Sequence, residues 1–242
     1  MAHPTPRQHT HRQFDRELAD IRNNALRLGG LAEDQIAKAM RALQSNNAAL
    51  AEEVIADDSK INALEVSVGQ QCLQILARRQ PIAIDLRLVV AVIKAVNDLE
   101  RIGDDAKRIA RITLSMADAP PSPQQLAALG EFAQGVALLL HDTLDAFARI
   151  DAEAAMQIKA RDRLLDVQYG DIMHALIAAM SADPRAIPAA LNQMWAARAL
   201  ERIGDRSCNI CEYTVYFALG KDIRHLSPEQ AALDLDLIAP RQ

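Results

Sequence analysis

Apolar residues recur every three or four positions along almost the whole chain, which is the spacing of a buried stripe on an α-helix. The first stripe comprises Phe14, Leu18, Ile21, Ala25 and Leu28. Two glycines interrupt it at 29–30, but the spacing then resumes, so the pattern predicts one long helix rather than two. Similar stripes recur further along. The pattern predicts helices at about 14–43, 48–77, 86–116, 126–149, 152–180 and 187–219.

Polar residues and glycine mark the ends of these helices. The segment 45–47, Ser-Asn-Asn, predicts a turn in which either asparagine caps the next helix. Pro81 falls in the following turn, and Asp85 is expected to cap the third helix. Gly220 is expected just beyond the sixth helix, because glycine adopts the left-handed conformation there without strain.

A proline-rich stretch divides the chain near its middle. Residues 118–123 are expected to form a linker, because prolines do not fit in the interior of a helix. On either side, residues 11–117 and 124–225 each contain three predicted helices, and 1–10 and 226–242 are expected to be tails. The predicted fold class is therefore all-α, with six long helices in two repeats.

The third helix of each half carries the same six residues, Leu-Glu-Arg-Ile-Gly-Asp, at 99–104 and at 200–205. The two acids of each copy are four positions apart, so they share a helical face and repel each other by about 0.2–0.5 kcal/mol. The glycine costs about 1 kcal/mol relative to alanine in a helix interior. Both copies of the hexapeptide have the repelling acids and the unfavourable glycine, which indicates that a favourable interaction offsets these two costs.

The second helix of each half carries a matching pair, Asp58 with Asn62 and Asp162 with Asp166. Carboxylate oxygens are good ligands for Mg²⁺, Mn²⁺ and iron, and a cation turns their repulsion into attraction. The predicted metal ligands are Glu100, Asp104, Glu201, Asp205, Asp58, Asp162 and Asp166. The alternative is a solvated face neutralised by nearby arginines, with the glycines admitting a neighbouring helix.

Composition excludes several classes of protein. The formal charge is −5 and no basic stripe is visible, which argues against nucleic-acid binding. The richest apolar run, at 86–96, is too short to span a membrane, and the first residues do not resemble a signal peptide. Three cysteines do not form a secreted disulfide framework. We expect a cytoplasmic protein without membrane insertion.

Three further features bear on chemistry. Cys208 and Cys211 form a C-x-x-C within a predicted helix and are expected to be small core residues. Trp195 is also expected in the core. The chain has no Glu-x-x-His, the pattern of di-iron helical bundles, which weighs against a carboxylate-bridged metalloenzyme. That enzyme remains the alternative function, and a metal-free helical scaffold is a third.

Several segments of the chain resemble the PhoU family. They are the two hexapeptides, Arg-Arg-Gln-Pro at 78–81 with Asp-Leu-Arg at 85–87, Asn-Ile-Cys-Glu at 209–212, and 144–149. The resemblance runs from about Phe14 to His225. It implies two pseudo-symmetric three-helix bundles that bind iron, zinc, manganese or magnesium through E(D)xxxD motifs. Asn62 departs from the acidic pattern, which implies that the two sites differ in affinity.

The resemblance also implies a function and partners. It implies a non-enzymatic regulator that restrains bacterial phosphate uptake and the phosphate regulon. The implied partners are the ATPase subunit of the phosphate ABC transporter, the regulon's sensor histidine kinase and a second copy of the chain, as a homodimer. Phe147 and Arg149, at the end of the fourth helix, are candidate partner contacts because aromatics and arginine are enriched at interfaces. Phenylalanine at such a position is more often part of the core, which is the alternative for Phe147.

Overall fold

The computed structural model describes residues 6–116, 123–224, 226 and 230. In this part of the chain all regular structure is helical, as the sequence predicts. The helices are α1 (Pro6–Ser45), α2 (Ala48–Arg79), α3 (Ala83–Ser115), α4 (Pro123–Arg149), α5 (Ala152–Ala182), the short 3₁₀ helix η1 (Pro184–Ala186) and α6 (Ile187–Leu219).

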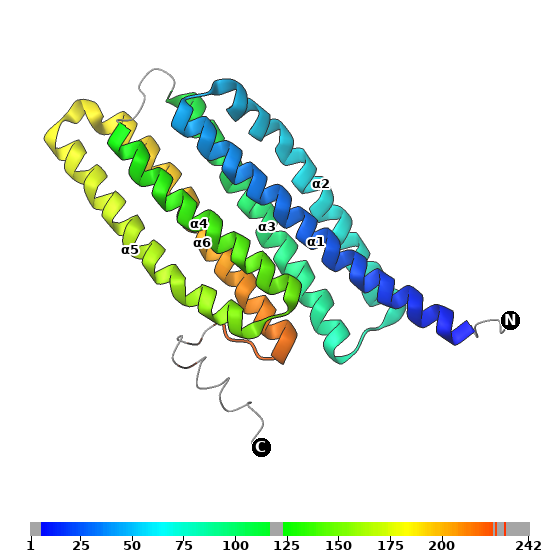
Figure 1. Ribbon diagram of the computed structural model, residues 1–242. Helices are drawn as coiled ribbons and strands as arrows, with labels where there is room; N and C mark the ends of the chain where they lie inside the picture. The colour runs from blue at the N-terminus through cyan, green and yellow to red at the C-terminus, as the bar shows by residue number, and fades with distance from the viewer. Residues whose placement is uncertain (1–5, 117–122, 225, 227–229, 231–242) are drawn as a thin grey trace.

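The helices form two three-helix bundles that lie side by side (Figure 1). In the first bundle α3 packs against α1 and α2, and in the second α6 packs against α4 and α5. The bundles meet where α3 packs on α6 and α1 on α4, while α2 and α5 lie on opposite outer sides (Figure 1). One apolar core runs through both bundles, and a smaller one lies within the second. The predicted pair of repeats is confirmed.

Helix α1 is continuous through its two glycines, as predicted. Gly29 has a packing role, because a Cβ atom there would lie 2.6 Å from Leu144 Cδ2 on α4. The missing side chain therefore lets the two bundles approach each other. The helix begins at Pro6, within the span 1–10 expected to be a tail, since proline is preorganised for the first turn. That part of the prediction is wrong, and residues 1–5 lie outside the described residues.

The turns between the first and second helices of the two bundles are built alike. Asn46 and Ile150 both adopt positive φ, at 50° and 59°. The next residue in each, Asn47 or Asp151, is an N-cap whose side chain accepts a hydrogen bond from the backbone of the following helix. The repeat therefore extends to turn geometry that the two sequences do not share.

The start of α3 differs from the prediction. The helix begins at Ala83, and Ile82 occupies the N-cap position without a side-chain hydrogen bond. Asp85 lies in the first turn, where its carboxylate favours the positive end of the helix dipole. The prediction that Asp85 caps the helix is wrong, because the helix starts before it. Gly220 ends α6 with φ of 74°, as predicted.

The predicted linker and C-terminal tail lie almost wholly outside the described residues. Pro123, assigned to the linker, is the first residue of α4. In the described part of the chain no helix combines the length and apolarity needed to cross a membrane.

Candidate functional site

The predicted acids of the first repeat face one another across α2 and α3. The first acidic cluster comprises Asp58 and Glu65 on α2 with Glu100 and Asp104 on α3. Gly103 allows this approach, because a Cβ atom there would lie 2.8 Å from Ile61 Cδ1 on α2. Burial, and then the negative charges of its three neighbours, raises the pKa of Glu100. Glu65 was not identified from the sequence, although it lies one turn beyond Asn62.

Lys107 supplies a cation to this first cluster. Its Nζ lies 2.6 Å from Asp58 Oδ2 and 3.8 Å from Asp104 Oδ1. The Asp58 side chain is only 4% exposed, so its charge depends on this partner. Asn62 Nδ2 also donates to Asp58 Oδ2, at 3.2 Å, while Asp58 Oδ1 and Asn62 Oδ1 are buried without a partner.

The second acidic cluster comprises Asp162 and Asp166 on α5 with Glu201 and Asp205 on α6. Here Gly204 brings the helices together, since a Cβ atom would lie 3.3 Å from Asp162 Oδ1. Burial is the main cause of the raised pKa values of Glu201 and Asp162, and neighbouring acids add to both. Asp162 and Glu201 are partly buried, whereas Asp166 and Asp205 are exposed.

A thiol occupies the position in the second cluster that an ammonium occupies in the first. Cys208 follows Asp205 by three residues, just as Lys107 follows Asp104, and its thiol donates a hydrogen bond to Asp162. Burial raises the pKa of Cys208, which keeps the thiol protonated and neutral. Arg198 pairs with Glu201 Oε1 at 2.6 Å from the solvent side, and Glu201 Oε2 is buried without a partner.

The residues fit a hard cation better in the second cluster than in the first. Both offer carboxylates together with buried oxygens that have no hydrogen-bond partner, and such oxygens are costly unless a ligand binds them. In the first cluster Lys107 already neutralises Asp58. Among the described residues, no three histidine, cysteine or acidic side chains are gathered as a preformed metal site. Binding would therefore require these side chains to turn toward a shared ion.

The remaining chemical features have structural roles. Glu212, further along the acidic face of α6, pairs with Lys159 at 2.6 Å and does not join the second cluster. Cys208 and Cys211 are buried and form no disulfide, which confirms their assignment to the core. Trp195 is 56% exposed, so the prediction that it packs in the core is wrong.

The two candidate partner contacts separate in the structure. Phe147 is 1% exposed and belongs to the core, so its ring does not form part of a docking surface. The Arg149 side chain is 62% exposed and lies 3.7 Å from Asp145. It borders a hollow between α4 and α5 that Arg161 and Gln157 also line. Arg149 therefore remains the candidate contact.

Known proteins share both the sequence and the fold of this chain. The model of the PhoU domain matches residues 25–113 and 129–214, once in each bundle. The phosphate-specific transport system accessory protein PhoU of Serratia marcescens is 43% identical over 232 residues, covering 96% of this chain and 94% of that protein. The protein of the same name from Escherichia coli is 39% identical and covers 92% of each chain.

Two crystal structures extend the comparison to the fold. PhoU from Pseudomonas aeruginosa superimposes with a TM-score of 0.83 at 40% identity, covering 86% of this chain and 100% of that one. The phosphate transport system regulatory protein PhoU from Streptococcus pneumoniae gives 0.80 at 31% identity, covering 86% and 98%. With the family's domain present in both bundles and close relatives spanning nearly its whole length, this chain belongs to the PhoU family.

Proposed function

We propose that this chain is a non-enzymatic, cytoplasmic regulator of phosphate uptake and of the phosphate regulon. The observation that carries the proposal is its 43% identity, over 96% of its length, to an accessory protein of a phosphate-specific transport system. The proposed partners are the ATPase subunit of the phosphate ABC transporter and the sensor histidine kinase of the regulon. Their interaction would hold the kinase's output down when phosphate is plentiful.

We further propose that the second acidic cluster binds a metal ion. Asp162, Asp166, Glu201 and Asp205 would hold it. The ion would neutralise carboxylates that lie close together, and it would offset the burial and the neighbouring negative charges that raise the pKa of Asp162 and Glu201. Iron, zinc, manganese and magnesium all accept such oxygen donors. The first cluster would bind more weakly, since Lys107 competes for Asp58.

Metal binding is tested by thermal unfolding with and without added ions. At a free metal concentration about 100-fold above Kd, binding stabilises the fold by about 2.7 kcal/mol, or roughly 5–10 °C in Tm for a chain of this size. The double variant Glu201→Gln/Asp205→Asn should lose this shift. The matched variant Glu100→Gln/Asp104→Asn should retain most of it. Loss only in the first-repeat variant, or no shift with any ion, would contradict the proposal.

The outer face of α5 provides apolar area for contact with a partner or a second copy. Leu164, Val167 and Ile177 are each about half exposed or more. Exposed apolar side chains gathered on one element are typical of interaction surfaces. We propose that partners and the dimer use the second bundle, with Arg149 at the edge of the kinase contact.

Partner binding is tested by titrating purified chain against the ATPase subunit and the kinase cytoplasmic region. Arg149→Glu should weaken kinase binding at least about tenfold, because reversing a contact charge produces repulsion. Circular dichroism should show unchanged helicity. Arg185→Glu is the matched control, since Arg185 is also an exposed arginine paired with a nearby aspartate, Asp183. Equal affinities for all three proteins would remove Arg149 from the proposal.

A further inference from the structure

A strongly basic cavity lies at the junction of the two bundles. It has a volume of about 360 Å³ and is formed by α3 and α6, the helices through which the bundles meet. Two aspartates, Asp104 and Asp105, lie among its lining residues. The other lining residues are Arg101, Arg108, Arg111, Arg202 and Arg206. The lining carries an excess of three positive charges in a chain whose overall charge is −5.

The most buried part of this lining is already neutralised. Asp105 has a side chain only 3% exposed and forms an ion pair with Arg206, and Arg202 Nη1 lies 3.7 Å from its other oxygen. These contacts explain two of the five arginines as structural. They also hold both guanidinium groups in place, because the Asp105 carboxylate between them is buried.

The other three arginines have no such explanation. Arg101, Arg108 and Arg111 are spaced along one face of α3, and within the described residues none has a carboxylate within ion-pair distance. Arg108 and Arg111 are three positions apart, a spacing at which like charges on one helical face repel each other. A bound anion would remove this repulsion.

We propose that this cavity binds a short phosphate chain, that is, a pyrophosphate or triphosphate group, across α3 and α6. Guanidinium groups match phosphate oxygens because their planar forks donate paired hydrogen bonds. The excess of three charges suits an anion with three or four negative charges rather than a single phosphate. The volume lies within the range of about 300–1,000 Å³ typical of small-molecule sites. Nucleic acid fits less well, because the acidic chain as a whole would repel a long polyanion.

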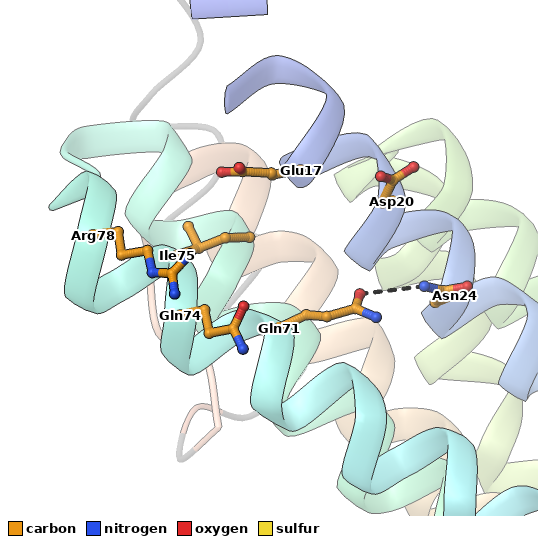
Figure 2. A pocket seen from close by; sticks show the side chains of 7 residues that line it. All are labelled: Glu17, Asp20, Asn24, Gln71, Gln74, Ile75 and Arg78. Atoms are coloured by element: carbon orange, nitrogen blue, oxygen red, sulfur yellow. Dashed lines mark hydrogen bonds between the residues drawn. The ribbon is translucent and has the colours of Figure 1, made fainter. Parts of the chain in front are cut away.

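A second hollow on the molecule differs from the basic cavity in the chemistry of its lining. It measures about 210 Å³, lies between α1 and α2, and is lined by side chains of mixed type (Figure 2). Asn24 donates to Gln71 across it at 3.3 Å, so its polar groups partly satisfy one another. Acids and amides dominate this lining, with Arg78 as its basic member. Its composition indicates no single class of ligand.

The test is calorimetric titration of the purified full chain in metal-free buffer. Pyrophosphate and tripolyphosphate should bind, and sulfate and citrate should bind at least about tenfold more weakly. Arg108→Gln and Arg101→Gln should each weaken pyrophosphate binding by about tenfold, since each removes a charge-assisted donor. Arg185→Gln, which alters an exposed arginine far along the chain from the cavity, should leave the affinity unchanged.

Titration with ATP distinguishes the two sources of a phosphate chain. Equal affinity for ATP and pyrophosphate supports a site for free pyrophosphate or tripolyphosphate. Tighter binding of ATP that Arg108→Gln abolishes supports a site for the phosphate groups of a nucleotide. Absence of pyrophosphate binding at millimolar concentration would overturn the proposal, as would equal binding of citrate or tighter binding of an oligonucleotide through the same arginines. The test needs neither the transporter nor the kinase, so its failure would leave the proposed function intact.

Discussion

The two acidic clusters occupy equivalent places in the two bundles but are neutralised differently. In the first, Lys107 inserts an ammonium group against the buried Asp58. In the second, the equivalent Cys208 offers only a neutral thiol to Asp162, and Glu201 retains a buried oxygen without a partner. One side-chain difference therefore separates a cluster whose aspartate is paired with an ammonium group from one whose aspartate meets only a thiol, where the nearby cation, Arg198, pairs with Glu201 instead.

Another pair of equivalent positions has diverged in a complementary way. Asp105 and Arg206 each follow the repeated hexapeptide directly, and they form an ion pair with each other where α3 meets α6. Identical residues there would place two like charges together in a buried position, which is strongly unfavourable. The two repeats therefore have the same residues where their surroundings are equivalent. They have different, complementary residues where equivalent positions contact each other across the interface between α3 and α6.

The largest expected effect comes from removing the cation of the first cluster. Lys107→Ala should lower the free energy of unfolding by about 3–5 kcal/mol at neutral pH, because it leaves Asp58 buried and unpaired. Urea denaturation measures the loss. The double variant Lys107→Ala/Asp58→Asn should recover most of it, since the orphaned charge is then absent.

The control for this prediction is Lys60→Ala. Lys60 Nζ lies at the same 2.6 Å from Asp57, but the Lys60 side chain is 65% exposed. Its loss should cost less than about 1 kcal/mol. Equal effects of the two lysine variants would show that burial does not distinguish the ion pairs, and the contrast between the clusters would fail.

A smaller effect separates the two hexapeptide glycines. Gly103→Ala should destabilise the fold by about 1 kcal/mol, because crowding the buried Ile61 costs about 1–3 kcal/mol and outweighs the gain in helix propensity. Gly204→Ala should be close to neutral, since its new Cβ meets Asp162 at 3.3 Å. Gly69→Ala, whose Cβ would meet nothing within 4 Å, should stabilise by about 1 kcal/mol. Urea denaturation ranks the three, and a Gly103 variant as stable as the Gly69 variant would contradict the prediction.

The helices were predictable because the information that determines them is local. The spacing of apolar residues, Asn47 at a cap and Gly220 at a helix end are properties of short segments. The prediction that Asp85 caps α3 was wrong because the N-cap position depends on the residue at which the backbone enters the helix. The prediction that Trp195 lies in the core was wrong because the exposure of a side chain depends on which helix packs against it. The sequence of α6 alone does not specify that neighbouring helix.

The acids of the candidate site were also predictable, whereas their partners were not. Glu100 and Asp104 share a face by spacing alone, but the contact of Lys107 with Asp58 joins two helices and depends on their packing register. A signal was nevertheless present in the sequence. Lys107 and Cys208 both lie three residues beyond the repeated hexapeptide, on its acidic face, so aligning the two helices at the repeat identifies both.

The smallest expected effect is a pH-dependent one in the second cluster. The pKa of Glu201 is raised despite its ion pair with Arg198, so the ionised carboxylate is less stable in the fold than in the unfolded chain. Because the folded pKa lies above the unfolded value, this cost is absent below about pH 4 and is fully present once the pH exceeds the raised pKa. In metal-free protein, Glu201→Gln should therefore raise Tm by about 1–2 °C at neutral pH, and the difference should vanish as the pH falls to about 4.

The equivalent change in the first cluster sharpens the comparison. Burial and neighbouring acids also raise the pKa of Glu100, so Glu100→Gln should give a pH dependence of the same sign. Added metal should reverse the sign only in the second cluster, because there the carboxylate becomes a ligand and its replacement removes binding energy. Tm measured across pH for both variants, with and without metal, separates the two cases. A variant difference that stays constant with pH would show that Glu201 is not the destabilised acid, and identical responses of the two variants to metal would show that Lys107 does not set the clusters apart.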